Sequence, residues 1–226
     1  MRKVVPALIV AVALVASCAT SNQAYEKAPL FGMIYDEDNQ PCVGVLLSLD
    51  GGAGKEESGP MTDIRGRFVL PEVGRGQHVL VARKDGYEEL SLKVTIMNRT
   101  DVLFLRMISF SQLLAGAEKA IEERKWDQAE AFLGRAGKLD SGDSVLLYLQ
   151  AVKAYRTGSY AEAVGHLMNI VEKGTREPSV YLFLADIYEK KLDDKEKAVE
   201  NLRAYLNVRA DSETEKRLSD LMTAQK

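Results

Sequence analysis

Several protein classes depend on residues of which this chain has few. Its 226 residues include two Cys, two His and one Trp. Two Cys cannot form the framework of a disulfide-stabilised domain. The two His, His78 and His166, lie far apart in the sequence and outside the H-E-x-x-H and H-x-x-E patterns that bind zinc. We therefore expect neither a metal site nor a cofactor.

No charge of one sign dominates the chain either. Lys and Arg number 30 and Asp and Glu number 33, which gives a net charge of -3 with both signs interspersed. Such a balance offers no basic field to a phosphate backbone, so we do not expect nucleic acid as a partner. The chain also lacks a G-x-S-x-G motif and a paired Cys and His, and its carboxylates are spread as on solvated helix faces. We therefore expect no enzymatic activity.

Long apolar runs are absent after the first segment. There, Arg2 and Lys3 precede an apolar run over residues 4–16, which is the pattern of a secretory signal. The run is shorter than the about 20 apolar residues that span a bilayer. It closes on Val15-Ala16-Ser17-Cys18, which resembles the lipobox of bacterial lipoproteins. The resemblance implies that residues 1–17 are a signal peptide and that Cys18 becomes the acylated first residue of an anchored chain.

The lipobox resemblance also implies a location in a bacterial cell envelope. Ala19 after the cysteine favours the outer membrane, by analogy with proteobacterial sorting, and leaves open the periplasmic or the surface face. Residues 18–28 are polar and aperiodic, so we expect a tether there. With Cys18 acylated, Cys42 is the remaining thiol, and its apolar neighbours predict a buried, inert side chain.

Residues 29–106 consist of short apolar runs separated by Gly, Pro, Asp and Asn. This spacing favours a small antiparallel β-sandwich, since helices require longer periodic runs. The expected strands are 31–35, 43–49, 68–70, 78–82, 90–96 and 102–105.

The β-segment also carries a set of motifs with a family resemblance. They are Gly32-x-Ile34-x-Asp36, Pro41-x-x-Gly44, Thr62-Asp63-x-x-Gly66-x-Phe68-x-Leu70, Val73-x-x-Gly76 and Gly86-Tyr87. Together they resemble the carboxypeptidase regulatory-like domain, which has a transthyretin-like β-sandwich fold. The resemblance implies no peptidase activity, because the associated peptidases carry their metal ligands in a separate domain. Residues 73–87 also resemble the PEGA-type β-repeat of bacterial envelope proteins, so two family assignments remain open.

Residues 110–226 repeat with a period of about 34. Small side chains recur at two positions of each period: Ala117, Ala151 and Ala185, and Ala129, Ala163 and Ala198. This pattern resembles the tetratricopeptide repeat, in which each period is a pair of antiparallel helices. The alanines are expected where the two helices of a pair cross, because larger side chains would push them apart. We expect three repeats and a capping helix that begins with the capping box Ser212-x-x-Glu215.

The repeat resemblance implies a concave groove, lined by the first helix of each pair, that binds a peptide. The family's ligand-facing positions correspond here to Leu114, Glu118, Ile121, Tyr148, Val152, Tyr155, Leu182, Asp186 and Glu189. Aromatic and apolar residues in the middle, with carboxylates at both sides, suit a segment with apolar anchors and some basic residues. The same central residues would also suit packing against the β-domain or the next helix, and the sequence leaves this open.

Together these patterns predict an α+β protein of two domains, a small antiparallel β-sandwich followed by a tetratricopeptide solenoid. We expect a non-enzymatic, lipid-anchored scaffold that binds another envelope protein or a peptide segment through its groove. The alternative is a surface adhesin or glycan-binding lipoprotein that uses the loops of the β-sandwich, with the repeats as a spacer.

Overall fold

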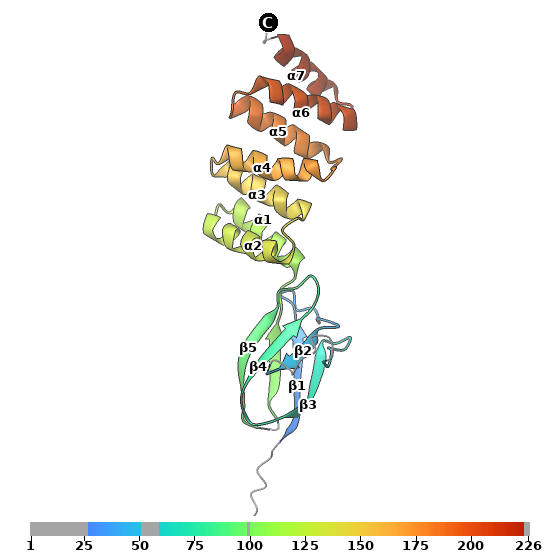
Figure 1. Ribbon diagram of the computed structural model, residues 1–226, viewed down its shortest axis with the longest axis vertical. Coiled ribbons are helices and arrows are strands. Elements are labelled where there is room, and N and C mark those ends of the chain that lie inside the picture. The colour runs from blue at the N-terminus through green and yellow to red at the C-terminus, as the bar shows by residue number, and fades with distance from the viewer. Residues whose placement is uncertain (1–26, 51–58, 99, 224–226) are drawn as a thin grey trace, which may run out of the picture.

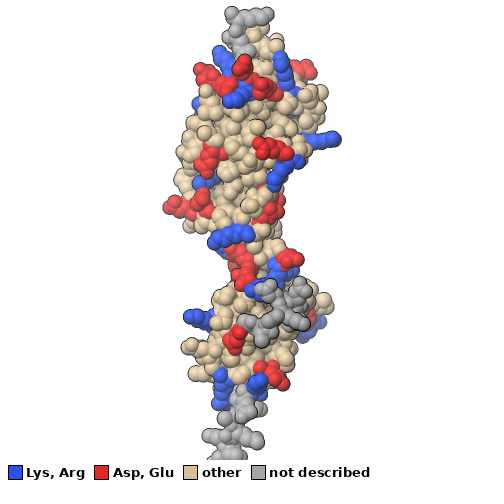
Figure 2. Space-filling model, viewed as in Figure 1, with Lys and Arg blue, Asp and Glu red and all other residues tan. Residues whose placement is uncertain are grey.

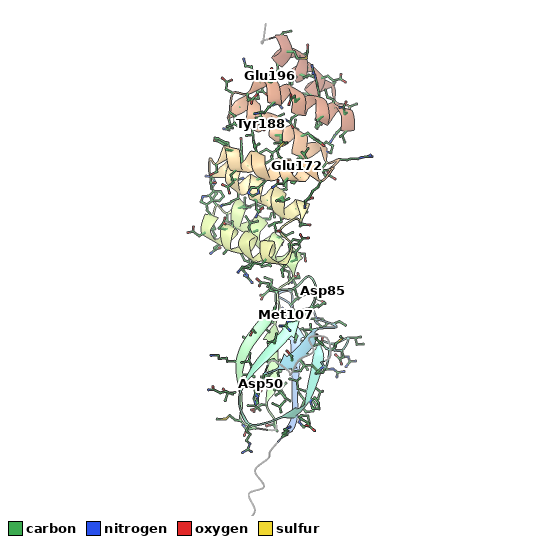
Figure 3. All side chains as sticks on the ribbon, viewed as in Figure 1. Asp50, Asp85, Met107, Glu172, Tyr188 and Glu196 are labelled. Atoms are coloured by element: carbon green, nitrogen blue, oxygen red, sulfur yellow. The ribbon has the colours of Figure 1, made fainter. Side chains whose placement is uncertain are left out.

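A computed structural model describes residues 27–50, 59–98 and 100–223. The signal peptide, Cys18 and most of the tether lie outside these ranges, so they remain predictions. Figure 1 shows a β-unit at one end of an elongated molecule and a stack of helices at the other, and Met107 lies where the chain passes between them (Figure 3). Acidic and basic side chains are interspersed over the face in Figure 2. Within the described ranges, none of the helices combines the length and the apolar character that a membrane span requires.

The described part of the β-unit contains six strands in two three-stranded sheets. Sheet A has the order β3-β1-β6, and sheet B has the order β2-β4-β5. The strands lie on the apolar runs that the sequence singled out: β1 Ala28–Tyr35, β2 Leu46–Leu49, β3 Arg67–Val73, β4 Gly76–Arg83, β5 Leu90–Ile96 and β6 Val102–Arg106.

One strand pair differs from the expected antiparallel arrangement. β1 and β6 are parallel, with Phe31 opposite Val102 and Tyr35 opposite Arg106, whereas the pairs β1·β3, β2·β4 and β4·β5 are antiparallel. A parallel pair cannot be joined by a hairpin and needs a long crossover. The chain from β2 to β5 supplies that crossover. The length and pattern of the apolar runs do not show whether β6 runs parallel or antiparallel to β1.

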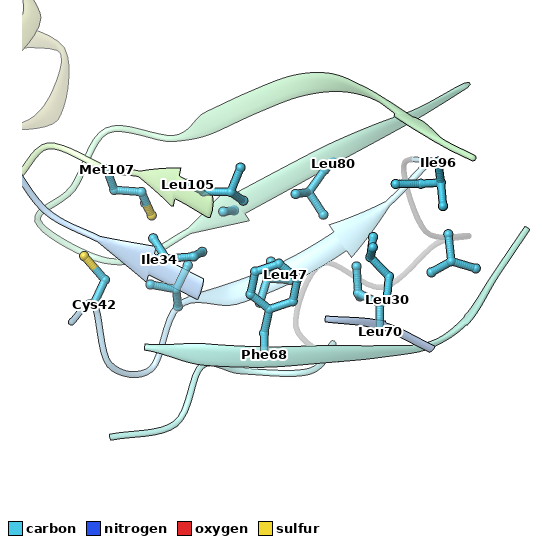
Figure 4. Packing of buried hydrophobic residues seen from close by; sticks show 13 residues of the cluster. Leu30, Ile34, Cys42, Leu47, Phe68, Leu70, Leu80, Ile96, Leu105 and Met107 are labelled. Atoms are coloured by element: carbon cyan, nitrogen blue, oxygen red, sulfur yellow. The ribbon is translucent and has the colours of Figure 1, made fainter. Parts of the chain in front are cut away.

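Side chains from both sheets form a single core in the β-unit (Figure 4). In sheet A, Leu30 and Ile34 of β1 point inward, and a Cβ on Gly32 between them would collide with the Phe68 ring. Buried members of this core include Leu30, Ile34, Cys42, Leu47, Phe68, Leu70, Leu80, Ile96, Leu105 and Met107. Cys42 is therefore a packed core residue, as predicted, and burial raises the pKa of its thiol.

The Thr62-Asp63-x-x-Gly66 motif forms the tight turn that its residue types predict. The Asp63 carboxylate accepts hydrogen bonds from the Arg65 and Arg67 amides at 2.8 and 2.9 Å, and Gly66 has a φ of 72°. The buried Thr62 hydroxyl donates to the Cys42 carbonyl at 2.5 Å and accepts from the Val45 amide at 2.8 Å. The motif thereby ties the start of β3 to the chain around Cys42.

Seven helices follow in the described residues. Pairs α1·α2, α3·α4 and α5·α6 pack side by side, and α7 packs on α6 (Figure 1). The bounds are α1 Phe110–Glu122, α2 Trp126–Leu139, α3 Ser144–Arg156, α4 Tyr160–Glu172, α5 Pro178–Lys190, α6 Lys195–Val208 and α7 Ser212–Thr223. The first helices of the pairs begin at 110, 144 and 178, so the 34-residue period of the sequence is the period of the structure.

The recurring alanines lie inside the helix pairs, as the repeat pattern predicts. Ala117, Ala129, Ala151, Ala163, Ala185 and Ala198 are each 0% exposed. The helix pairs therefore approach closely at the small side chains, which is the packing that the tetratricopeptide resemblance implied.

Residues suited to a helix start begin α3 and α5, and one predicted cap, that of α7, is corrected. Asp143 caps α3 by accepting from the amides of Val145 and Leu146, and Pro178 occupies the first turn of α5. The capping residue of α7 is Asp211, whose carboxylate accepts from the Glu213 amide, so Ser212 is not the cap but the first helical residue. Both residues are good caps by type, and the sequence alone did not separate them.

Candidate functional site

An aromatic cluster joins the second and third helix pairs. The Phe183 ring of α5 contacts Tyr148 and Tyr155 of α3, with centroid distances of 6.0 and 5.2 Å, and Tyr155 also contacts Tyr160 of α4 at 5.6 Å. The two contacts of Phe183 are edge-to-face, which is a favourable geometry for aromatic pairs. All four side chains are partly buried. The cluster is therefore packed in part and still presents part of its residues to solvent.

The predicted central groove residues Tyr148 and Tyr155 thus lie together, and the sequence analysis missed their partner. Phe183 follows Leu182, which is the residue one period after Tyr148, so the family pattern selected its neighbour instead. A cation also lies at this cluster. The Lys191 ammonium is 5.7 Å from the Tyr155 centroid and 5.5 Å from the Tyr160 centroid, within the range of a cation–π interaction.

The acidic residues expected at the third repeat are engaged within the chain. Arg217 of α7 donates to Asp186 at 2.6 Å and, through Nε, to Glu189 at 2.8 Å. Lys190 also lies 3.1 Å from Asp186. The prediction that Asp186 and Glu189 are free to attract a basic partner is therefore wrong, because α7 already supplies the opposite charge.

Three of the predicted groove positions lie next to the core of the first helix pair. Ile121 is 2% exposed and packs in that core, so it is not available to a ligand, and its place on the predicted lining is corrected. Leu114 and Val152 are partly buried against the same core, whereas Glu118 is exposed. The helical period places Ile121 on the correct side of α1, but it does not predict how deeply that side is packed. Leu182, in the third pair, is partly buried.

The two units meet at the first helix pair. Arg135 of α2 forms a bidentate pair with Glu88, with nitrogen–oxygen distances of 2.6 and 3.0 Å, and Gln112 donates to Asp38 at 2.6 Å. The main chain adds a bond from the Phe110 amide to the Gly86 carbonyl at 2.8 Å. These bonds fix how the β-unit meets α1 and α2.

In the described residues, the β-unit meets the helices away from the aromatic cluster. Asp85 lies at the junction in Figure 3, whereas α3 and α5 lie further along the stack in Figure 1. A cavity of about 470 Å³ lies at the junction and has both acidic and basic walls, lined by Lys84, Asp85, Gly86, Tyr87, Phe110, Lys138, Leu139 and Asp140. Tyr148 and Tyr155 pack in part against Phe183 of the next helix pair, and ligand binding by their exposed part stays a prediction.

The histidines have structural partners. His78 of β4 lies 2.5 Å from the Asp50 carboxylate through Nδ1 and 2.9 Å from the Gly74 carbonyl through Nε2. The hydrogen bond with Asp50 raises the pKa of His78 and lowers that of Asp50. His166 lies 3.7 Å from Glu162 on α4. No group of three potential metal ligands occurs in the described part of the chain.

Solved tetratricopeptide-repeat domains are similar to about half of this chain. The domain of Arabidopsis OM64 is 15% identical, covers 50% of this chain and 93% of its own, and gives a TM-score of 0.44. The N-terminal domain of stress-induced protein-1 from C. elegans is 18% identical, with coverages of 50% and 94% and a TM-score of 0.46. The Yersinia enterocolitica type III secretion chaperone SycD, solved with a peptide of the translocator YopD, is 19% identical, with coverages of 50% and 89% and a TM-score of 0.44. No protein-family model and no curated protein matches the chain.

Proposed function

We propose that this chain is a lipid-anchored scaffold of a bacterial envelope that binds a segment of another protein and catalyses no reaction. The observation that carries the proposal is the aromatic cluster of Tyr148, Tyr155, Tyr160 and Phe183. Partly exposed tyrosines on a rigid helical support are the side chains that dominate protein interfaces, because they bury much area at a small cost in conformational entropy.

The charges around the cluster indicate what kind of segment fits. Asp186 and Glu189 are paired with Arg217, Asp186 also lies next to Lys190, and Lys191 lies at the tyrosine rings. Glu118 of α1, another carboxylate that the sequence assigned to the groove, is exposed. We therefore propose a partner segment with aromatic or aliphatic anchors at the cluster and a basic residue near α1.

The anchor is proposed from the sequence alone. The lipobox ending at Cys18 supports acylation of that residue, and Ala19 supports delivery to the outer membrane. We also propose that the β-unit belongs to the carboxypeptidase regulatory-like class. The Thr62-to-Gly66 turn and the single core between two sheets support this assignment.

Metabolic labelling with an alkyne fatty acid tests the anchor. The wild-type chain should incorporate the label and fractionate with membranes, and Cys18→Ala should abolish incorporation. Cys42→Ala is the matched control, because Cys42 is a buried core thiol and should not affect labelling. Equal labelling of Cys18→Ala and the wild type would refute acylation at this residue.

Affinity enrichment of the full chain from crosslinked envelopes tests the binding surface. Tyr148→Ala should reduce recovery of the partner by about tenfold or more, because interface tyrosines often contribute 2 kcal/mol or more. Met168→Ala on α4, where Met168 is 36% exposed, is the control and should leave recovery unchanged. Circular dichroism melts of both variants would separate lost binding from lost folding.

The charge at the α1 end is tested by reversal. Glu118→Lys should weaken binding of a partner with a basic residue there, whereas Glu200→Lys, at another exposed site on α6, should not. If Glu118→Lys and Tyr148→Ala each recover as much of the partner as the wild type does, the proposed surface is excluded.

A further inference from the structure

The outer face of sheet A is apolar and exposed. Phe31 of β1 lies opposite Val69 of β3 and Val102 of β6, and Met33 lies opposite Phe104. Met33 also lies opposite Arg67 of β3, which is exposed and ion-paired with Asp63 at the edge of this surface. The exposed fractions are 47% for Phe31, 44% for Val69, 45% for Val102 and 73% for Phe104. Because paired residues lie on the same side of a sheet, these side chains form one continuous surface. We call it the sheet A face, and it consists of Phe31, Met33, Val69, Val102 and Phe104.

Strand formation does not require this apolar face. The outward residues of β5 in sheet B are polar and exposed: Ser91, Lys93 and Thr95. The inward residues Leu30, Ile34, Phe68 and Leu70 already supply the core on the other side of sheet A. Contiguous exposed apolar surface on a folded protein marks a contact with another apolar surface.

The N-terminal connection determines what lies close to this face. The tether enters β1, the central strand of sheet A, and Phe31 follows the first strand residue, Ala28, by three positions. From Cys18 to Ala28 the chain advances 28 - 18 = 10 residues, which span at most about 35 Å. A domain of about 80 residues has a radius of gyration of roughly 12 Å. The distance between the β-unit and a membrane that holds Cys18 therefore cannot much exceed the diameter of the unit.

We propose that the sheet A face docks on the lipid bilayer surface. The inference rests on the membrane attachment proposed above. The short tether keeps the face at a high local concentration next to the bilayer, so a modest apolar contact is sufficient to hold it there.

The rim of the face suits the headgroup region. The Tyr35 hydroxyl lies 3.8 Å from the Met33 sulfur on the same side of β1, and amphipathic rings favour the membrane interface. Arg106 lies at the same end, is exposed, and donates to the Asp36 carbonyl and the Asn39 side-chain oxygen. Both acceptors are neutral, so the guanidinium keeps its charge for anionic headgroups.

Docking by this face would set the orientation of the whole molecule. The strands of the β-unit run along the long axis of the molecule in Figure 1. A sheet face turned to the bilayer therefore lays that axis along the surface, and the stack of helices extends beside the membrane.

Spin labels on the full chain test the docking. Phe104→Cys carries a nitroxide on the sheet A face, and Lys93→Cys carries the matched label on the outward side of β5. The native Cys42 is 1% exposed and does not compete for the label. In vesicles of phosphatidylethanolamine and phosphatidylglycerol, oxygen collisions should exceed nickel-chelate collisions at position 104, and the order should reverse at position 93.

The outcomes separate docking from attachment. If the chain floats with the vesicles but the nickel chelate reaches both labels equally, docking is refuted and attachment stands. If the chain does not float with the vesicles, attachment fails and the docking proposal is overturned with it. Spin–spin broadening between labels at position 104 would identify a second copy as the occupant and would also overturn the proposal.

Discussion

Single small residues set the packing of the helical stack. The six recurring alanines are 0% exposed, and the sequence predicted their positions because a fixed period is visible without any structure. The pair His78–Asp50 was not predictable in this way. Its members are 28 residues apart and belong to no repeat, so only the fold brings them together.

Enlarging one of these alanines should destabilise the fold. Ala151→Leu should lower the free energy of unfolding by about 1 to 3 kcal/mol, because the crossing of α3 and α4 leaves no room for the added carbons. Ala161→Leu, at an exposed position of α4, should change it by less than about 0.5 kcal/mol. Urea unfolding of both variants measures the difference, and equal effects would contradict the packing described here.

The His78 imidazole should titrate above its ordinary value of 6.5, because the Asp50 carboxylate stabilises its charged form. The raised pKa of His78 means that its contribution to stability is fully present below pH 6.5 and is lost as the pH rises through the native pKa. The lowered pKa of Asp50 means that its own contribution is lost as the pH falls through that pKa. Proton NMR of the imidazole should show the pKa falling in Asp50→Asn and unchanged in Asp85→Asn. An unchanged pKa in Asp50→Asn would rule out the pair in solution.

At the scale of elements, the turn within each helix pair uses one left-handed residue. Gly158 has a φ of 87°, and the equivalent residues Arg124 and Asp193 have φ values of 56° and 52°. Only the glycine is a residue type that adopts this conformation without strain, so the residue types at the other two positions do not indicate it. The parallel pairing of β1 and β6 was not predicted from the sequence either, because strand direction depends on distant parts of the chain.

Replacing Arg124 by Gly should stabilise the protein. A non-glycine residue in the left-handed region costs about 1 to 2 kcal/mol, and the greater freedom of glycine in the unfolded chain offsets roughly 0.5 to 1 kcal/mol of the gain. We expect a higher melting temperature for Arg124→Gly and a lower one for Gly158→Ala. A lower melting temperature for Arg124→Gly would contradict the assigned backbone conformation.

The stability of the capping helix α7 against local opening should depend on the side chain of Arg217. Arg217→Gln removes the guanidinium that bridges the partly buried Asp186 and Glu189, at a cost of about 1 kcal/mol or more. Amide hydrogen exchange in α7 should then accelerate about fivefold or more. Lys216→Gln, at the preceding exposed position, should leave exchange unchanged. Equal acceleration in both variants would show that Arg217 does not hold the helix.

At the scale of the whole molecule, a β-unit and a helical stack are joined by a defined junction. The sequence predicted both parts from their different periodicities, and it also selected Tyr148 and Tyr155. It did not predict the ring contacts of Phe183 or the ion pairs of Arg217 with Asp186 and Glu189. Those contacts form between neighbouring helix pairs and the last helix, which the pattern within one repeat does not describe. The aromatic cluster is therefore the surface of the described helices that we propose for a partner.

The most direct test of that central claim is site-specific photocrosslinking in intact cells. Benzoylphenylalanine in place of Tyr148 retains an aromatic ring at the cluster, and the same residue in place of Met168 probes the exposed side of α4. The account predicts a crosslinked adduct with one protein at position 148 and none at position 168. The absence of an adduct at position 148, or the same adduct at both positions, would contradict it.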